Sequence, residues 1–307
     1  MDNQKLKIIF MGTPEFAVAS LQRLVEEKFN VIAVITAPDK PQGRGKQLGT
    51  SSVKDYALTQ NLPMLQPTNL KDPEFLEELK GYHADLQIVV AFRMLPEAVW
   101  NMPPLGSYNL HGSLLPDYRG AAPINWAIMN GEKETGVTTF KLKHEIDTGN
   151  VLFQETEPIN YEDNVGTVYE RLMKLGADLV VKSVTAIASG QYELKPQKPE
   201  TEPKHAPKIF REDCEINWDQ PSEKVRDFIR GLSPYPAAWT LLKEQTFKVF
   251  AAEKSPQKYN GVSGTFKTDN KTYLDVITSN GALRLMEVQM QGKKRMTVGE
   301  FLRGFQL

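Results

Sequence analysis

The chain has 307 residues, of which 40% are hydrophobic and 24% charged, and this average composition excludes disordered, collagen-like and coiled-coil proteins. Its length favours two domains, and its net charge of −1 gives no nucleic-acid signal. One cysteine, Cys214, excludes an internal disulfide, and because no apolar run is long enough for a signal peptide or a membrane span, we expect a cytoplasmic protein.

The first hundred or so residues alternate between strand and helix patterns. Strand patterns occupy residues 5–12, 31–36, 86–92 and 106–111, and helix patterns occupy residues 14–27, 53–60 and 74–79. A long loop rich in Gly, Lys and Arg is expected at residues 39–52. This alternation predicts an α/β fold with a doubly wound parallel sheet, whose functional residues lie at the carboxyl ends of the strands.

The chain changes character after residue 190. Further helix patterns lie at residues 122–129, 166–189 and 222–231, and strand patterns lie at 135–142 and in several short runs between 240 and 290. Residues 191–207 contain four prolines among many charges, which is the composition of an extended linker. The short strands predict a small closed or half-closed barrel. We therefore expect a catalytic domain at 1–190, a linker at 191–207 and a second domain at 208–307.

Charge is distributed unevenly between these expected domains. Residues 1–190 carry 18 Lys and Arg against 23 Asp and Glu, whereas residues 191–307 carry 19 against 15. An acidic catalytic body with a basic appendage would suit a polyanionic substrate. Chance variation between two surfaces explains the same numbers, so charge alone leaves both interpretations open.

Three side chains form the best candidate for chemistry. Asn109 and His111 lie two apart on a predicted strand, so they share one face of the sheet near its carboxyl end, and Asp147 follows a later strand in a turn. In acyl transfer to an amine, histidine is a suitable general base and an asparagine N–H can stabilise an oxyanion. Asp147 would then hold His111 or a proton-carrying water. His144 is a rival base, and a lone strand histidine is often only structural.

Two other motifs point elsewhere but are incomplete. The segment after the first strand has only Gly12 where a dinucleotide-binding fingerprint needs three glycines, so NAD binding is not expected. Residues 147–149 read Asp-Thr-Gly, as in aspartic proteases, but the chain has no second such motif to supply the partner carboxylate.

The runs NLHGSLLPDYRGAAPINWAI (109–128) and HEIDTGNV (144–151) resemble the signature of 10-formyltetrahydrofolate-dependent formyltransferases and hydrolases. The runs IIFMGTPEFA, APDKPQGRGKQL, KIFREDCEINW and IRGLSPYPAAWT are similar to the members that act on initiator methionyl-tRNA, so the resemblance covers nearly the whole chain. It implies a Rossmann-like catalytic domain, a linker and a barrel of the OB type. It also implies 10-formyltetrahydrofolate as formyl donor, initiator methionyl-tRNA as partner, a monomer, and neither a metal nor a membrane.

The resemblance assigns roles by position. Carried over residue by residue, the family's catalytic residues fall on Asn109, His111 and Asp147, and its folate-binding segment falls on Ser113, Leu114, Leu115 and Pro116. The loop with Arg44 and Lys46 resembles an insertion that contacts the acceptor end of tRNA. Basic residues of the second domain would follow the tRNA backbone, namely Lys208, Arg211, Lys293, Lys294 and Arg295.

One segment departs from the family pattern. Other activities of the same family also stay possible. The stretch VVAFRMLPE, with Arg93, replaces a glycine-containing stretch near the folate pocket, so the sequence does not predict the shape of that pocket. Sibling enzymes that formylate glycinamide ribonucleotide or amino sugars, or that hydrolyse formyl folate, use similar residues, but the second domain favours a tRNA substrate. A non-catalytic tRNA-binding module is the alternative from a different class.

Overall fold

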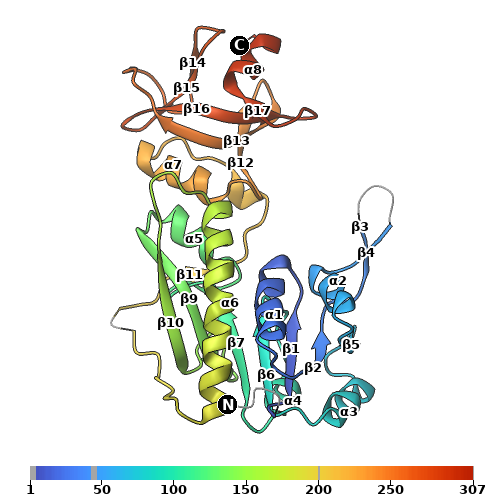
Figure 1. Ribbon diagram of the computed structural model, residues 1–307. Helices are drawn as coiled ribbons and strands as arrows, with labels where there is room; N and C mark the ends of the chain where they lie inside the picture. The colour runs from blue at the N-terminus through green and yellow to red at the C-terminus, as the bar shows by residue number, and fades with distance from the viewer. Residues whose placement is uncertain (1–4, 43–46, 200, 307) are drawn as a thin grey trace. The chain divides into compact units, whose positions relative to one another are not determined.

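The computed structural model of the protein describes residues 5–42, 47–199 and 201–306 (Figure 1). Contacts divide these residues into two compact units. The first unit takes the described residues of Met1–Arg119, Gly136–Glu157 and Glu170–Lys204, and the second takes those of Gly120–Thr135, Pro158–Tyr169 and His205–Leu307. The expected domain borders stay a prediction, because the second unit also includes two segments that precede residue 190.

The first unit is built on a seven-stranded sheet in the order β10-β9-β7-β6-β1-β2-β5. The strands are β1 (Ile8–Gly12), β2 (Val31–Ile35), β5 (Met64–Leu65), β6 (Leu86–Val90), β7 (Ser107–His111), β9 (Glu134–Lys141) and β10 (Val151–Pro158). The five strands from β7 to β5 are parallel, and β9 is antiparallel to β7. This confirms the expected Rossmann-like, doubly wound sheet, whose strand order reverses between β1 and β6.

Helices connect these strands, and two of them begin at side-chain caps. They are α1 (Glu15–Glu26), α2 (Ser52–Thr59), α3 (Pro73–Gly81), α4 (Glu97–Trp100) and α6 (Val165–Ser189). The Ser51 hydroxyl accepts the Lys54 backbone N–H at 3.0 Å, and the Asp72 carboxylate accepts the Glu74 N–H at 3.4 Å. Such caps satisfy donors that the first helical turn leaves without partners, so they set where each helix starts.

The sheet has an apolar core because its central strands are buried on both faces. All five residues of β1 and all five of β6 are buried, which explains why the two strands are apolar apart from Gln87, whose side-chain oxygen accepts the Ser107 hydroxyl at 2.8 Å. One core cluster of this unit consists of Ile9, Met11, Ala33, Ile35, Leu65, Leu70, Phe75, Leu79, Val89 and Val99. Burying such a side chain stabilises the fold by roughly 1.5–3 kcal/mol.

The second unit contains an antiparallel sheet in the order β12-β13-β16-β15-β14, with β17 paired to β16. Its strands are β12 (Ala238–Leu242), β13 (Gln245–Lys254), β14 (Phe266–Thr268), β15 (Leu274–Thr278), β16 (Gly281–Met290) and β17 (Met296–Thr297). Lys243 and Glu244 form the β12–β13 turn with φ values of 48° and 62°, as a two-residue hairpin requires. Register shifts around Ala251 bend β13. The curved sheet confirms the expected half-closed C-terminal barrel.

Helices of the second unit include one that comes from far earlier in the chain. They are α5 (Pro123–Met129), α7 (Ser222–Gly231) and α8 (Val298–Gly304). The Asn125 side-chain amide donates to the Gly231 carbonyl at 2.8 Å, and a Cβ at Gly231 would clash with Met129. This close approach of α5 to α7 explains why residues 120–135 group with the C-terminal residues.

Two segments that were expected to lack regular pairing are paired. The flanks of the loop at 39–52 form a short antiparallel ribbon of β3 (Lys40–Gln42) and β4 (Gln47–Gly49), so the expectation of an irregular loop was wrong for these flanks. In the expected linker, Lys195 exchanges backbone hydrogen bonds of 2.7 and 2.8 Å with Val151 of β10. The chain after residue 190 is therefore extended, but it is attached to the first unit.

Candidate active site

Asn109 and His111 lie near the carboxyl end of β7, where the sequence pattern predicted them. Asn109 is opposite Phe140 of β9 and His111 is opposite Thr138, so the two polar residues share one face of the sheet. Asn109 is partly buried, and the His111 residue is only 6% exposed. The polar pair lies at the carboxyl edge of the sheet, one strand away from the point where the strand order reverses and where doubly wound folds have their binding crevice.

A backbone carbonyl sets the orientation of the His111 ring. His111 Nε2 lies 2.8 Å from the Tyr118 carbonyl oxygen. A carbonyl can only accept a hydrogen bond, so Nε2 carries the hydrogen and Nδ1 is the basic nitrogen of the neutral ring. Nδ1 lies 3.9 Å from Asp147 Oδ2, which is too far for a direct hydrogen bond. Tyr118 therefore holds the ring, while Nδ1 faces the Asp147 carboxylate without a direct hydrogen bond to it.

Asp147 is part of a tight turn that folds back on the end of β9. Its φ of 52° is in the left-handed region, which costs a non-glycine residue about 1–2 kcal/mol. Gly149 presses against the Lys141 carbonyl so closely that a Cβ has no room, and the Lys141 N–H donates to the Asn150 carbonyl at 2.9 Å. The Asp-Thr-Gly run is thus explained by the turn. His144, the rival base, is exposed in the same loop.

The segment expected to bind folate is a turn fixed by an internal hydrogen bond of Ser113 and by two hydrogen bonds with Thr138 of β9. The Ser113 hydroxyl donates to the Asp117 carbonyl at 2.6 Å, and the Thr138 hydroxyl donates to the Ser113 carbonyl at 2.7 Å. The Leu115 N–H in turn donates to Thr138 Oγ1 at 3.1 Å. Ser113 and Leu115 are buried, whereas Leu114 and Pro116 are partly exposed. Only the latter two offer side-chain surface to a ligand.

Arg93, the departure from the family pattern, joins two loops at the carboxyl edge of the sheet. Its guanidinium donates to the Thr68 carbonyl at 3.0 Å and to the Pro67 carbonyl, and it lies 5.6 Å from the centre of the Phe92 ring. The loop after β6 is thereby attached to the loop after β5.

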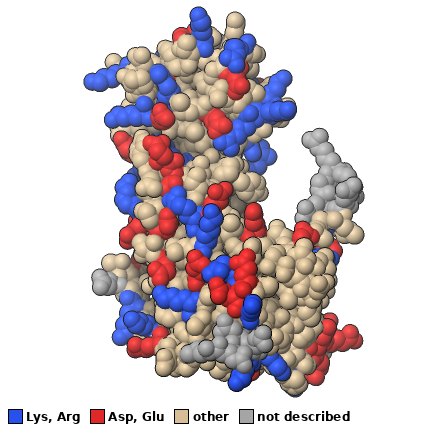
Figure 2. Space-filling view, in the orientation of Figure 1, with Lys and Arg blue, Asp and Glu red and all other residues tan. Residues whose placement is uncertain are grey.

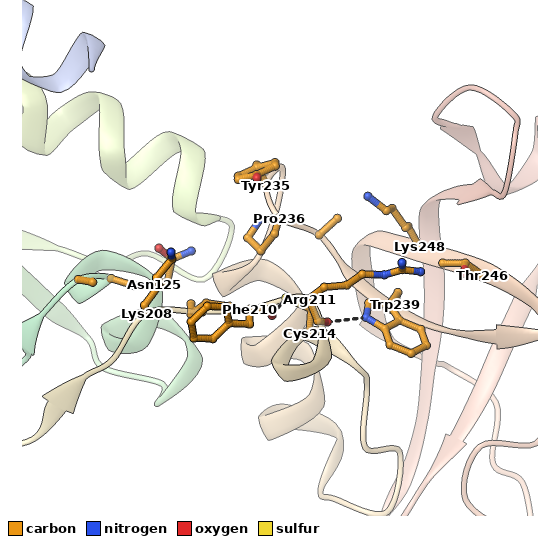
Figure 3. Close-up of a pocket in the computed structure, with 14 residues that line it drawn as sticks. Asn125, Lys208, Phe210, Arg211, Cys214, Tyr235, Pro236, Trp239, Thr246 and Lys248 are labelled. Atoms are coloured by element: carbon orange, nitrogen blue, oxygen red, sulfur yellow. Dashed lines mark hydrogen bonds between the residues drawn. The ribbon is translucent and has the colours of Figure 1, made fainter. Parts of the chain in front are cut away.

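A second candidate site is a cavity of about 510 Å³ in the second unit (Figure 3). Its lining includes three cations and three aromatic rings, namely Lys208, Arg211, Lys248, Phe210, Tyr235 and Trp239. Lys208 Nζ lies 5.1 Å from the centre of the Phe210 ring, and the Arg211 guanidinium lies 5.9 Å from that of Trp239. The Trp239 indole N–H donates to the Arg211 carbonyl at 2.9 Å, which fixes the ring beside the cation. Cations and exposed rings of this kind suit phosphates and stacked bases.

The structure brings together only some of the expected tRNA contacts. Lys208 and Arg211 line this cavity, but Lys293, Lys294 and Arg295 lie in the exposed turn before β17, where Arg295 pairs with Glu287 and covers the Phe250 ring. Arg44 and Lys46 lie outside the described residues. On the face drawn in Figure 2, Lys and Arg side chains are spread over the region of the C-terminal strands, interrupted by Asp and Glu. The cavity lining also includes Lys248, Tyr235 and Trp239, which were not predicted from the sequence, although Tyr235 and Trp239 stand in the SPYPAAWT run.

Two classes of site are absent from the part of the chain that the structure describes. No group of three or more His, Cys, Asp or Glu side chains there could hold a metal ion. No helix among those residues is long and apolar enough to cross a membrane.

Comparisons with known proteins give a consistent result. The family model described as Formyl transferase matches residues 5–184, and the one described as Formyl transferase, C-terminal domain, matches residues 208–306. A protein of Parabacteroides distasonis named Methionyl-tRNA formyltransferase is 54% identical over 315 residues, covering 99% of this chain and 97% of the relative.

Two solved structures share the fold at low identity. The N-formyltransferase from Helicobacter canadensis, in complex with folinic acid and dTDP-3-aminofucose, has a TM-score of 0.69 and 22% identity, covering 93% of this chain and 99% of that one. HypX from Aquifex aeolicus, in complex with tetrahydrofolic acid, has a TM-score of 0.65 and 20% identity, covering 97% of this chain. Only 47% of HypX is covered, so this chain spans about half its length.

Proposed function

The chain belongs to the formyl transferase family, and we propose that it transfers the formyl group of 10-formyltetrahydrofolate to the amino group of methionyl initiator tRNA. The observation that carries the proposal is the arrangement of Asn109, His111 and Asp147 at one edge of the sheet. The identity of 54% to a relative named for this activity supports the choice of acceptor. The chemistry follows from the positions of the three side chains.

His111 acts as the general base. The methionyl amine attacks the formyl carbon, and the attacking nitrogen must lose a proton as the new C–N bond forms. Nδ1 is the basic nitrogen of the ring, because Nε2 donates its hydrogen to the Tyr118 carbonyl at 2.8 Å. The proton therefore passes to His111 Nδ1 and then to N10 of the folate as the old C–N bond breaks. No covalent enzyme intermediate is needed, since the amine itself is the nucleophile.

Asn109 and Asp147 stabilise the charges that this step creates. The side-chain N–H of Asn109 donates to the oxyanion that develops on the formyl oxygen, a contact worth roughly 3 kcal/mol in comparable sites. The Asp147 carboxylate, 3.9 Å from Nδ1, stabilises the imidazolium through its charge. Of the two roles expected for Asp147, we take the one toward His111, because the carboxylate charge acts on the ring at this distance without a direct hydrogen bond.

The donor and the acceptor are bound by different surfaces. The turn at Ser113–Pro116 presents Leu114 and Pro116 to the flat folate, next to His111 in the chain. Lys208, Arg211 and Lys248 of the cavity neutralise tRNA phosphates, while Tyr235 and Trp239 offer rings for stacking. Lys293, Lys294 and Arg295 add backbone contacts of low sequence specificity, and Arg44 and Lys46 contact the acceptor end.

The test is a transfer assay with labelled formyl folate and three acceptors in parallel: methionyl initiator tRNA, glycinamide ribonucleotide and a dTDP-linked 3-amino sugar. We expect rapid labelling of the tRNA alone. Labelling of the sugar nucleotide would contradict the tRNA assignment and favour the activity named for the Helicobacter canadensis protein. If tRNA binds but the folate is never consumed, the chain is a binding module and the catalytic proposal is wrong.

A further inference from the structure

One glutamine in the segment expected to be a linker contacts both loops of the candidate active site. The Gln197 amide nitrogen donates to the Asp147 and Gly149 carbonyls, each at 2.9 Å. Its carbonyl oxygen accepts from Arg119 Nε at 3.1 Å and from Nη2 at 2.5 Å. These partners are 48 to 78 residues away in the chain, so a single side chain joins the turn after β9 to the loop after β7.

Both loops contain strained backbone at the residue that faces His111. Asp147 has a φ of 52° and Tyr118 has a φ of 59°, and neither is glycine. A left-handed residue of this kind persists only where its surroundings hold it. Gln197 bonds the carbonyl of Asp147 itself, and it bonds the side chain of the residue that follows Tyr118. Gln197 thus acts on Tyr118, which orients the His111 ring, and on Asp147, which faces Nδ1 of that ring.

The rest of the connecting segment strengthens the same attachment. Lys195 is paired with Val151 of β10, which fixes the chain just before Gln197. Beyond it, the Lys204 carbonyl accepts the Tyr118 N–H at 2.6 Å, and the Lys204 N–H donates to Asp117 Oδ1 at 3.0 Å. The loop that carries Tyr118 is therefore held on both sides by the segment that leads out of the first unit.

We propose that Gln197 is a positioning residue, which keeps His111 Nδ1 and the Asp147 carboxylate at the separation that proton transfer needs. This inference rests on the proposed function. Gln197 touches neither the amine nor the folate in this role; it acts through Arg119 and the Asp147 turn. Because a misplacement of about 1 Å can cost on the order of 100-fold in rate, the loss of its hydrogen bonds lowers turnover without lowering substrate affinity.

The test compares near-isosteric variants that lose these hydrogen bonds, Gln197→Leu and Gln197→Met, with Gln191→Leu. Gln191 is an exposed glutamine of the same segment, so its variant is the matched control. With 10-formyltetrahydrofolate and methionyl initiator tRNA, we expect kcat to fall about 10- to 100-fold in both Gln197 variants, with both KM values within about threefold of wild type. Gln191→Leu should behave as wild type.

A second pair of variants asks whether the two loops are coupled through this side chain. We expect Arg119→Met to lower kcat as well, and the double variant to be hardly worse than Gln197→Leu, since both changes break one bridge. Equal kcat for Gln197→Leu and wild type, a rise in KM alone, or fully multiplicative effects in the double variant would each overturn the inference. Wild-type protein that does not formylate the tRNA in the same series contradicts the proposed function itself.

Discussion

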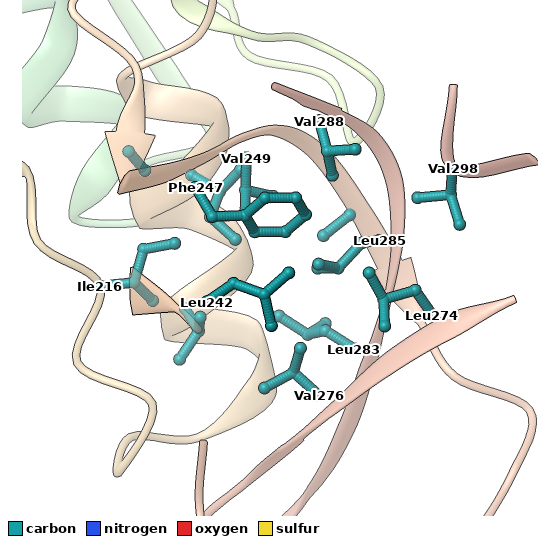
Figure 4. Packing of buried hydrophobic residues seen from close by; sticks show 14 of the residues in the cluster. Ile216, Leu242, Phe247, Val249, Leu274, Val276, Leu283, Leu285, Val288 and Val298 are labelled. Carbon is teal, nitrogen blue, oxygen red and sulfur yellow. The ribbon is translucent and has the colours of Figure 1, made fainter. Parts of the chain in front are cut away.

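The loops of the candidate active site and the barrel of the second unit are held in different ways. In the barrel, a large apolar cluster surrounds Phe247 and Leu285, and each of these side chains contributes a share of the burial (Figure 4). In the catalytic loops, backbone strain at Tyr118 and Asp147 is held by a few polar contacts. Stability in the barrel is spread over many residues, whereas the geometry around His111 depends on single ones.

One charged side chain of the barrel, Asp275, is buried among polar partners, and its contacts sharpen the contrast. Asp275 is fully buried and accepts hydrogen bonds from Ser255, Tyr259 and two nitrogens of Arg284. Burial raises the pKa of the Tyr259 phenol, and its hydrogen bond to the Asp275 carboxylate raises that pKa further. These contacts join β15 to β16 and to the loop after β13, and none of the four residues lines the cavity described above. We therefore expect changes in the loops to alter rate and changes in the barrel to alter stability.

The largest expected effect is on rate, from His111→Ala. Loss of the general base should lower kcat about 1,000-fold, because general-base catalysis contributes 100- to 10,000-fold in typical enzymes. Binding of methionyl initiator tRNA, measured by filter retention, should change little. His144→Ala is the control, because His144 is exposed in the adjacent loop and should retain activity. If the tRNA affinity falls and the bound-state rate does not, His111 is not the base.

The next effect is on stability, from Asp275→Ala. Removing the carboxylate leaves Arg284 and two hydroxyl groups without their partner, which should lower the free energy of unfolding by about 3 kcal/mol. Urea unfolding followed by circular dichroism measures this change. Glu253→Ala, an exposed carboxylate on β13, should stay within about 0.5 kcal/mol of wild type. A variant that keeps its stability but loses turnover would break the proposed division between the two regions.

The smallest effect is on tRNA affinity, from changes in the cationic cavity. Arg211→Gln and Lys248→Gln should each weaken tRNA binding several-fold and reduce the salt dependence of binding by about one ion, because each removes one phosphate contact. Binding is measured over a series of salt concentrations, and kcat at saturating tRNA should not change. Lys258→Gln, at an exposed site that does not line the cavity, is the control. An unchanged salt slope in both cavity variants would rule out phosphate contacts there.

Local sequence patterns determined many of the elements of this protein and marked the candidate residues for its chemistry. Largely apolar runs predicted β1 and β6, and helical spacing predicted α1 and α7. The two-residue spacing of Asn109 and His111 placed both on one face of β7. Each of these inferences depends on burial and hydrogen bonding within a few residues. Periodicity over so few residues can be recognised directly in the order of apolar and polar residues along the sequence.

Only the tertiary structure decided how those parts are held together. The group that orients His111 is the backbone carbonyl of Tyr118, and every residue type has such a carbonyl, so no pattern marks it. Gln197 stands in a proline-rich segment that predicts a linker, yet it bonds residues 50 and 78 positions away. Helix α5 likewise belongs to the C-terminal unit because it contacts α7, about 100 residues later in the chain. Contacts over such separations depend on the path of the folded chain, which local periodicity does not encode.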